Sequence, residues 1–242
     1  MNDSVKPYDE YGSKKDQVEA MFDNIAPRYD LLNRVLSMGI DKGWRRRAIR
    51  ALAERQPKMV LDMATGTGDL AIEIICRTNV EKVVGLDLSR EMLQVGRRKI
   101  RKRGFHDRIE MVQGEAEDID FPDNTFDGIT VAFGVRNFED LNKGLEEMHR
   151  VLKPGGKLVV LEFSKPYSFP FKQLFQIYFR YILPPIGRIA SNDPEAYGYL
   201  YRSVQAFPEG QAFVDILQAN GFKNSQCKPL TLGVCSLYTA EK

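Results

Sequence analysis

The hydrophobic pattern divides the chain into a short helical part and a longer part in which strands and helices alternate. Apolar residues recur at helical spacing over residues 18–25 and again over residues 31–36, on the way to Trp44. This spacing predicts two or three short helices within residues 17–56. The preceding residues 1–16 are polar, and we expect them to be flexible.

From residue 59 onward the pattern predicts strands separated by amphipathic helices. The apolar runs that predict the first five strands lie at residues 59–64, 82–88, 109–116, 126–134 and 157–164. Near-continuous apolar strands that alternate with helices indicate a mostly parallel sheet covered on both faces. After an aromatic-rich stretch at 166–201, a helix leads to two closely spaced runs, which predict an antiparallel hairpin.

The expected fold is therefore α/β, with a doubly wound, mostly parallel sheet of seven strands. An N-terminal helical lid at 17–56 and an insertion at 166–201, before the sixth strand, complete a single domain of residues 17–242. A chain of 242 residues can bury enough surface to fold without disulfides or metal ions.

Composition excludes several classes of protein. The 35 basic and 33 acidic residues leave a net charge of +2, too weak a field to indicate a nucleic-acid partner. The three cysteines have no metal-ligand spacing, so we expect no metal site and a reducing compartment. Because the chain has no run of about 18 apolar residues and no apolar leader, we expect a cytoplasmic protein.

A glycine-rich turn follows the first predicted strand. Gly66 and Gly68 lie where the apolar run turns into a helix, and glycine there permits a positive φ and close approach of a ligand. Asp87 ends the next strand, which suits a carboxylate that accepts from two ribose hydroxyls. The order strand, turn, helix, strand and acid predicts an adenosine site.

The same spacing also fits a nicotinamide dinucleotide, so two cofactors compete at this point. S-adenosylmethionine carries an ammonium and a sulfonium, and carboxylates suit these cations better than phosphate-binding amides do. Asp62 and Asp69 flank the glycines, and Glu115 lies just past the third strand, where it can accept from an adenine amine. These three carboxylates favour S-adenosylmethionine.

Four segments carry a resemblance to a known family. They are VLDMATGTGD from Val60, VVGLDLSREML from Val83, GVRNF from Gly134 and RVLKPGGKLVVLEFS from Arg150. They resemble the menaquinone and ubiquinone C-methyltransferases, the demethylmenaquinone methyltransferase type, from about residue 17 to the end. Many methyltransferases share the first two segments, whereas the last two are narrower. A fifth segment, from Tyr29 to Trp44, is similar to the family's N-terminal signature but departs from it at Leu32 and Asp41.

The resemblance implies transfer of a methyl group from S-adenosylmethionine to a ring carbon of a polyprenylated quinol. The simplest acceptor is demethylmenaquinol, and 2-polyprenyl-6-methoxy-1,4-benzoquinol of ubiquinone synthesis is a second. The family's cofactor positions fall on Thr67, Asp87, Glu115 and Ala116. The sequence leaves open the preference between naphthoquinol and benzoquinol, the prenyl length and the oligomeric state, a homodimer included.

Methylation at carbon requires an activated acceptor. A ring carbon is a poor nucleophile until the neighbouring phenol, with a pKa near ~10, is ionised, so we expect a cation and a base. Arg136, just beyond the fourth strand, is expected to stabilise the phenolate; the alternative is an ion pair that fixes its loop. Tyr29, Asp30 and Glu162 are the candidates for the base.

Two further patterns bear on membranes. Residues 171–182 carry one apolar helical stripe, which predicts either core packing or a lid that contacts the prenyl tail or a bilayer. Six of the seven residues in 97–103 are basic, and residues 45–47 add three arginines. Such runs predict a solvated helix face or a contact with anionic lipid at the inner face of the membrane.

Three other functions stay open on sequence grounds. They are an O- or N-methyltransferase for another small molecule, a nicotinamide-dependent oxidoreductase, and a cofactor-binding module without activity.

Overall fold

The computed structural model describes residues 5–8, 11–37, 39–166, 169–177 and 195–242, and within them it contains one sheet of seven strands. The strands are β1 (Met59–Met63), β2 (Lys82–Asp87), β3 (Ile109–Gln113), β4 (Phe126–Ala132), β5 (Leu152–Phe163), β6 (Lys223–Leu230) and β7 (Cys235–Glu241). Their order across the sheet is β3-β2-β1-β4-β5-β7-β6. The first five strands pair in parallel, and β7 is antiparallel to both β5 and β6. The predicted doubly wound sheet and its final hairpin are confirmed.

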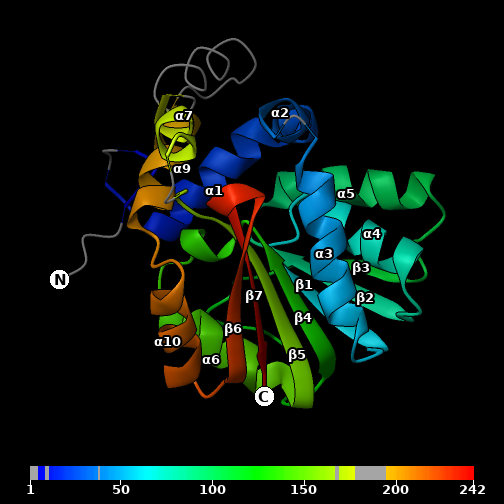
Figure 1. Ribbon diagram of the computed structural model, residues 1–242. Helices are drawn as coiled ribbons and strands as arrows, with labels where there is room; N and C mark the ends of the chain where they lie inside the picture. The colour runs from blue at the N-terminus through cyan, green and yellow to red at the C-terminus, as the bar shows by residue number, and fades with distance from the viewer. Residues whose placement is uncertain (1–4, 9–10, 38, 167–168, 178–194) are drawn as a thin grey trace.

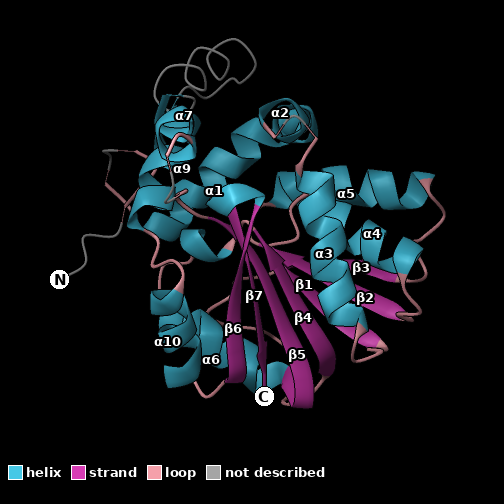
Figure 2. Ribbon diagram, in the orientation of Figure 1, coloured by secondary structure: helices cyan, strands magenta, loops and turns pink. Residues whose placement is uncertain are grey.

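Helices cover both faces of this sheet (Figures 1 and 2). One face carries α3 (Asp41–Ala53), α4 (Asp69–Arg77) and α5 (Arg90–Lys102), and the other carries α6 (Leu141–Val151) and α10 (Gln211–Ala219). Successive side chains of a strand point to opposite faces, so Leu158 and Val160 pack in one core while Val159 and Leu161 pack in the other. This double burial explains the continuous apolar runs of the sequence.

The remaining helices lie beyond the carboxyl ends of the parallel strands. They are α1 (Lys14–Ile25), η1 (Ala26–Arg28), α2 (Tyr29–Leu36), α7 (Phe171–Ile177) and α9 (Glu195–Ala206), with the short turns η2 (Val135–Asn137) and η4 (Thr231–Gly233) beside them. A third apolar cluster joins this layer, in which Val18 and Met21 of α1 pack with Phe175 of α7 and with Tyr197 and Tyr199 of α9. The N-terminal helices and the insertion thus share one small core.

The N-terminal boundaries differ from the prediction. The α1 helix begins at Lys14, where the Ser13 hydroxyl accepts from the Asp16 backbone N–H, so residues 14–16 belong to the helix. Lys14 is buried, and its ammonium donates to the carbonyls of Arg136 at 3.0 Å and Phe138 at 2.6 Å. These contacts with a distant loop fix a segment whose local sequence is polar.

The predicted lid at 17–56 also includes a helix that is not part of a lid. Trp44, Ile49 and Leu52 of α3 are buried where this helix packs against β4, β5 and β7, so α3 covers one face of the sheet. Within the described part of residues 17–56, α1, η1 and α2 lie beyond the carboxyl ends of the strands, and the lid stays a prediction for these helices. Helical spacing alone does not distinguish a helix that covers a sheet from one that covers a ligand site.

The predicted apolar helix at 171–182 is described only as far as residue 177. Phe175 is buried in the third cluster, as core packing predicts, whereas Ile177 is 49% exposed. Residues 178–182 lie outside the described residues. Among the helices that the structure describes, none combines the length and apolar character needed to cross a bilayer.

Candidate active site

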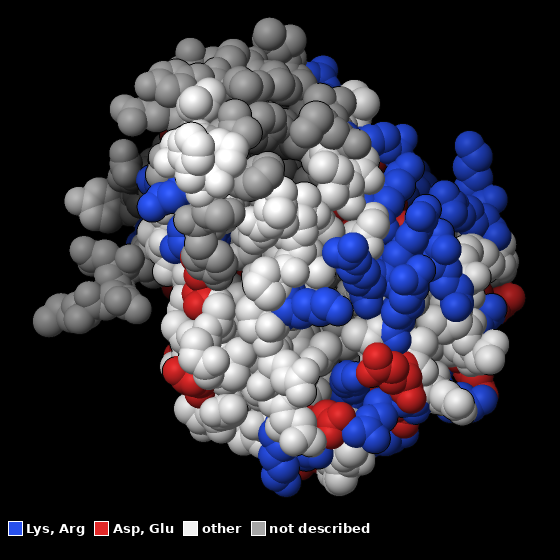
Figure 3. Space-filling model, viewed as in Figure 1, with Lys and Arg blue, Asp and Glu red and all other residues white. Residues whose placement is uncertain are grey.

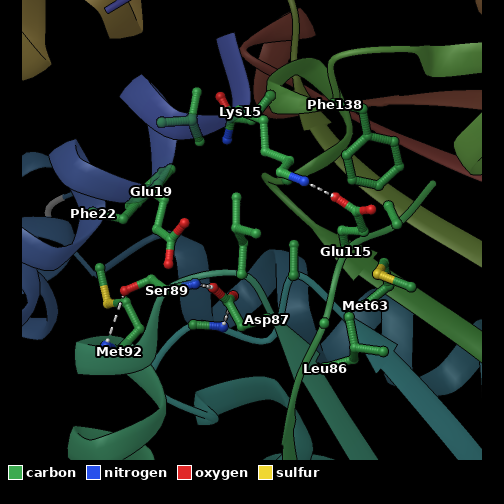
Figure 4. Close-up of a pocket in the computed structure, with 18 of the residues that line it drawn as sticks. Lys15, Glu19, Phe22, Met63, Leu86, Asp87, Ser89, Met92, Glu115 and Phe138 are labelled. Atoms are coloured by element: carbon green, nitrogen blue, oxygen red, sulfur yellow. Dashed lines mark hydrogen bonds and ion pairs between the residues drawn. The ribbon is translucent and has the colours of Figure 1, made fainter. Parts of the chain in front are cut away.

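A cleft lies between α1 and the loops at the carboxyl ends of β1 to β4 (Figure 4). The space between these elements measures about 740 Å³, which includes open solvent. The residues that line it include Lys15, Glu19, Phe22, Tyr29, Met63, Gly66, Asp87, Ser89, Met92, Glu115, Ala116, Phe133, Gly134, Asn137 and Phe138. This edge is where open α/β sheets bind their ligands.

The glycine turn forms one side of the cleft. Gly66 and Gly68 have φ values of 57° and 76°, a backbone region that residues other than glycine rarely adopt, so the turn depends on both. Gly66 lines the cleft as predicted. A Cβ on Gly68 would instead face Met111 and Ile100 in the core, so Gly68 shapes the turn without contacting the cleft.

Asp87 connects the turn to the floor of the cleft. Its carboxylate accepts the backbone N–H of Gly66 at 2.7 Å and that of Ser89 at 2.9 Å. Burial raises the pKa of Asp87 to about 6, and these two hydrogen bonds limit the rise. The carboxylate is thus held in position at the end of β2, as the sequence predicted.

Glu115 and Ala116 line the cleft after β3, also as predicted. The Glu115 carboxylate forms an ion pair with Lys15 of α1, across the opening between the two elements. Ala116 is 6% exposed and packs in the core below.

The α1 helix contributes cleft residues that sequence reasoning missed. Lys15, Glu19 and Phe22 recur on one face, and Figure 4 shows Glu19 directed toward Ser89 and Asp87. Burial and the neighbouring Asp23 raise the pKa of Glu19. In the sequence, only the apolar positions of this helix indicated a buried face, because charged residues on an amphipathic helix usually face solvent.

Asp62 does not line the cleft. It is 1% exposed and accepts the hydroxyls of Thr65 and Thr130, each at 2.6 Å. Burial raises the pKa of Asp62 to about 6. The structure therefore places this carboxylate behind the glycine turn, where it holds β1 to β4, and its contact with the cofactor stays a prediction.

Thr67 also lies away from the cleft lining. Its hydroxyl donates to Asp30 at 2.5 Å and accepts from Lys99 at 3.0 Å. Asp69 pairs with Lys99 and with Arg45, so its carboxylate is likewise committed. The polar side chains around the glycines therefore contact one another more than they contact the cleft.

Arg136 of η2 and Glu162 of β5 form a buried ion pair, and neither residue is among those that line the cleft. The guanidinium Nη1 donates to Glu162 Oε1 at 2.8 Å, and the two side chains are 7% and 0% exposed. Glu162 also accepts the backbone N–H of Phe163 at 2.8 Å. The Nε of Arg136 is buried and has no hydrogen-bond partner among the described residues, so one donor of the guanidinium is uncommitted.

Tyr29 and Asp30 begin α2 and point to different surroundings. Tyr29 lines the cleft, and its ring lies 3.7 Å from the position that a Cβ on Gly66 would occupy. Burial raises the pKa of the Tyr29 hydroxyl, which therefore keeps its proton near neutral pH. Asp30 does not line the cleft. One of its carboxylate oxygens accepts from Thr67 and the other accepts from Lys99.

The charges of the cleft favour a cationic ligand. Among the described residues, its lining includes the five carboxylates of Glu19, Asp87, Glu115, Glu117 and Glu139 but a single cation, Lys15. Such an environment disfavours a pyrophosphate and suits a ligand with an ammonium or a sulfonium. The geometry fits S-adenosylmethionine better than a nicotinamide dinucleotide.

Solved structures that resemble the chain share its fold. A SAM-dependent methyltransferase from Aquifex aeolicus is 23% identical, with a TM-score of 0.57 over 80% of this chain and 88% of the other. The [4+2]-cyclase SpnF is 18% identical, with a TM-score of 0.57 over 94% of this chain and 96% of the other. Because proteins of different activity share this architecture, it does not by itself define the reaction.

Sequence relatives are much closer. Demethylmenaquinone methyltransferase of Bacteroides fragilis is 48% identical over 99% of this chain and 98% of its own length. A ubiquinone/menaquinone biosynthesis C-methyltransferase UbiE from Geotalea daltonii is 48% identical over 95% of this chain and 97% of its own length. The model of the ubiE/COQ5 methyltransferase family matches residues 10–242, which confirms the resemblance seen in the sequence. The chain belongs to the ubiE/COQ5 methyltransferase family.

Proposed function

We propose that this protein transfers the methyl group of S-adenosylmethionine to a ring carbon of a polyprenylated quinol, with demethylmenaquinol as the acceptor. The observation that carries the proposal is one continuous cleft with a carboxylate-lined end at Asp87 and Glu115 and a second end at Phe133 and Asn137. The names of the relatives from Bacteroides and Geotalea support the choice of acceptor and of C-methylation.

The carboxylate-lined end has the groups that an adenosine needs. We assign Asp87 to the ribose hydroxyls, because its carboxylate is fixed by two backbone N–H groups and still lines the cleft. We assign Glu115 to the adenine amine and Gly66 to close backbone approach. When bound, S-adenosylmethionine supplies an electrophilic methyl group on a sulfonium.

Beside the other end, behind the residues that line the cleft, lies a buried cation, Arg136, which suits an ionised acceptor. We propose that Arg136 stabilises the phenolate of the quinol through its uncommitted Nε–H, while Glu162 holds the guanidinium in place. This assignment makes Glu162 a positioning residue and not the base. Tyr29, which keeps its proton, serves as a hydrogen-bond donor beside the methyl group, and the phenol proton is released to solvent.

Turnover with defined acceptors tests the proposal. Purified protein, S-adenosylmethionine and chemically reduced demethylmenaquinone are expected to give a product in which a methyl group replaces a ring hydrogen, a net mass gain of CH2, with a new carbon-bound methyl signal in its NMR spectrum. A methoxy signal would indicate an O-methyltransferase. Binding of NAD and not S-adenosylhomocysteine in calorimetry would indicate an oxidoreductase, and cofactor binding without turnover on any quinol would contradict the proposed reaction.

We also propose that one face of the protein binds the membrane that holds the quinol. Figure 3 shows Lys and Arg gathered over α3 and α5. We define the basic face as the exposed residues Arg46, Arg47, Arg50, Arg98, Arg101 and Lys102. Beside it, Leu31 of α2 is 60% exposed and Ile40 is 40% exposed, although large apolar side chains usually avoid water.

A lipid surface explains both features. Anionic headgroups attract basic residues by roughly 1 kcal/mol each, and exposed apolar side chains add affinity when they enter the interface. The basic face and the apolar residues lie at or beside α2, which covers one side of the cleft. A protein that binds the membrane through this face would therefore hold its cleft close to the bilayer.

Vesicle sedimentation tests this docking. We expect binding to equimolar phosphatidylcholine and phosphatidylglycerol, weaker binding to phosphatidylcholine alone, and a loss of the difference as salt screens the charges. The variant Arg46→Glu/Arg47→Glu/Arg50→Glu is expected to lose the preference for anionic vesicles, whereas Lys143→Glu on α6 keeps it. Equal binding to both vesicles by the unmodified protein, or binding to neither, would refute the docking face.

A further inference from the structure

A network of charged groups joins the lid to the glycine turn on the side away from the cleft. Lys99 of α5 is its centre: the ammonium donates to Asp30 Oδ2 at 2.7 Å, to Thr67 Oγ1 at 3.0 Å and to the carboxylate of Asp69. Four elements meet there, namely α2, the turn after β1, the start of α4, and α5. The side chain of Lys99 is 23% exposed, so it does not belong to the solvated basic run that surrounds it in the sequence.

The network leaves the Asp30 carboxylate no free oxygen in this structure. Asp30 Oδ1 accepts from Thr67 at 2.5 Å, and Asp30 Oδ2 accepts from Lys99. Because Asp30 is the second residue of α2, these bonds hold the first turn of the lid helix. Tyr29, its chain neighbour, is thereby placed against Gly66 in the cleft.

A second cation supports the same arrangement. Arg45 of α3 pairs with Asp41 and Asp69, at 3.2 Å each. Although burial by itself raises the pKa of Asp69, the charges of Lys99 and Arg45 outweigh burial and hold this pKa below its usual value. Asp69 is therefore a fixed anion that orients Lys99 from the sheet side, while Asp30 binds it from the lid side.

The close approach of α5 makes this contact reachable. Gly96 lies one turn before Lys99, and a Cβ at Gly96 would come within 3.2 Å of the Thr67 backbone. Only glycine allows the α5 backbone to lie this near the turn. The ammonium of Lys99 consequently reaches both the hydroxyl of Thr67 and the carboxylate of Asp30 at the start of α2.

We propose that Lys99 is a positioning residue that latches α2 over the cofactor end of the cleft through Asp30, and so sets how fast the cofactor leaves. The inference rests on the proposed cofactor. In the latched state Tyr29 closes one wall of the cleft, and release of the Lys99–Asp30 pair frees α2 to move away. Lys99 itself is not among the described residues that line the cleft.

The test compares Lys99→Met with Lys99→Arg, and with Lys143→Met as an exposed control of the same chemical change. For Lys99→Met we expect S-adenosylhomocysteine to dissociate about tenfold faster and the KM for S-adenosylmethionine to rise about tenfold, with kcat changed much less. Lys99→Arg keeps a charged donor and is expected to restore most of the residence time. Lys143→Met should match the unmodified protein.

Hydrogen exchange separates the latch from the proposed cofactor. In the ligand-free protein, Lys99→Met should speed amide exchange across residues 29–36 and leave the exchange of β1 and β4 unchanged. Asp30→Asn should have the same effect, and the double variant Lys99→Met/Asp30→Asn should add little to either single change.

Several outcomes would overturn the latch. They are unchanged exchange in α2, additive effects of Lys99→Met and Asp30→Asn, or faster exchange in every element, which would indicate a general loss of stability. If the unmodified protein fails to bind S-adenosylhomocysteine, the proposed cofactor is wrong, and the exchange of α2 still decides whether Lys99 holds the lid.

Discussion

Arg136 has two roles to separate: its ion pair with Glu162 stabilises the fold, and we propose that it stabilises the phenolate. A loss of activity alone would not distinguish them. The guanidinium and the Glu162 carboxylate are almost fully buried and lie 2.8 Å apart, with Glu162 at 0% exposure. Replacing Arg136 with methionine keeps most of the volume but leaves a carboxylate without its counter-charge in the interior. The protein should therefore lose stability as well as turnover.

The size of the stability loss follows from burial. Breaking a buried pair by removing one partner costs ~3–5 kcal/mol, because the remaining charge has lost its water and its partner. For a chain of this size, 1 kcal/mol corresponds to about 2–4 °C in Tm. We therefore expect Arg136→Met to unfold roughly 6–20 °C below the unmodified protein.

A double variant removes the orphan charge. Arg136→Met/Glu162→Gln has no buried charge at this position, and glutamine can still accept from the Phe163 backbone N–H. Replacing both partners of a buried pair is often close to neutral. In urea unfolding, the double variant should recover most of the free energy of unfolding that Arg136→Met loses.

Turnover then reports the catalytic role alone. If Arg136 stabilises the phenolate, the restabilised double variant should still turn over slowly while it binds S-adenosylhomocysteine normally. Raising the pH should partly rescue it, since more of a phenol with pKa near ~10 ionises unaided. Near-normal turnover in the double variant would refute the catalytic role, and a double variant as unstable as Arg136→Met would refute the orphan-charge explanation.

Two further predictions follow from individual contacts. Burial raises the pKa of Asp87 to about 6, above its value in the unfolded chain. Lowering the pH from about 8 to about 5 should therefore weaken S-adenosylhomocysteine binding, because the carboxylate takes up a proton. Over the same range the ligand-free protein should gain stability from this group. Calorimetry and urea unfolding across that range measure both, and Asp87→Asn should show weak binding without the pH dependence. A Cβ on Gly96 would lie 2.5 Å from the Met111 Cε and 3.2 Å from the Thr67 backbone, so Gly96→Ala should cost ~1–3 kcal/mol in urea unfolding. Gly43→Ala on α3, where a Cβ meets nothing within 4 Å, should gain up to ~1 kcal/mol, and equal effects of the two changes would contradict the close-packing explanation.

The sequence determined those parts of the protein that depend on neighbours along the chain. Continuous apolar runs predicted parallel strands buried on both faces, and the order of Gly66, Asp87 and Glu115 predicted that these three residues meet at one edge of the sheet. These predictions held because the carboxyl ends of parallel strands meet at one edge of the sheet, which brings the residues that follow each strand together.

Other features depended on contacts between distant elements, and the tertiary structure alone decided them. Lys15 and Glu19 reach the cleft because α1 packs against α7 and α9, and Lys99 binds Asp30 because α5 approaches the glycine turn at Gly96. Asp62 turned inward because the hydroxyls of Thr65 and Thr130 satisfy it there. A charged residue looks the same in sequence whether it faces water or a buried partner. Only the partner, supplied from elsewhere in the fold, makes its burial favourable.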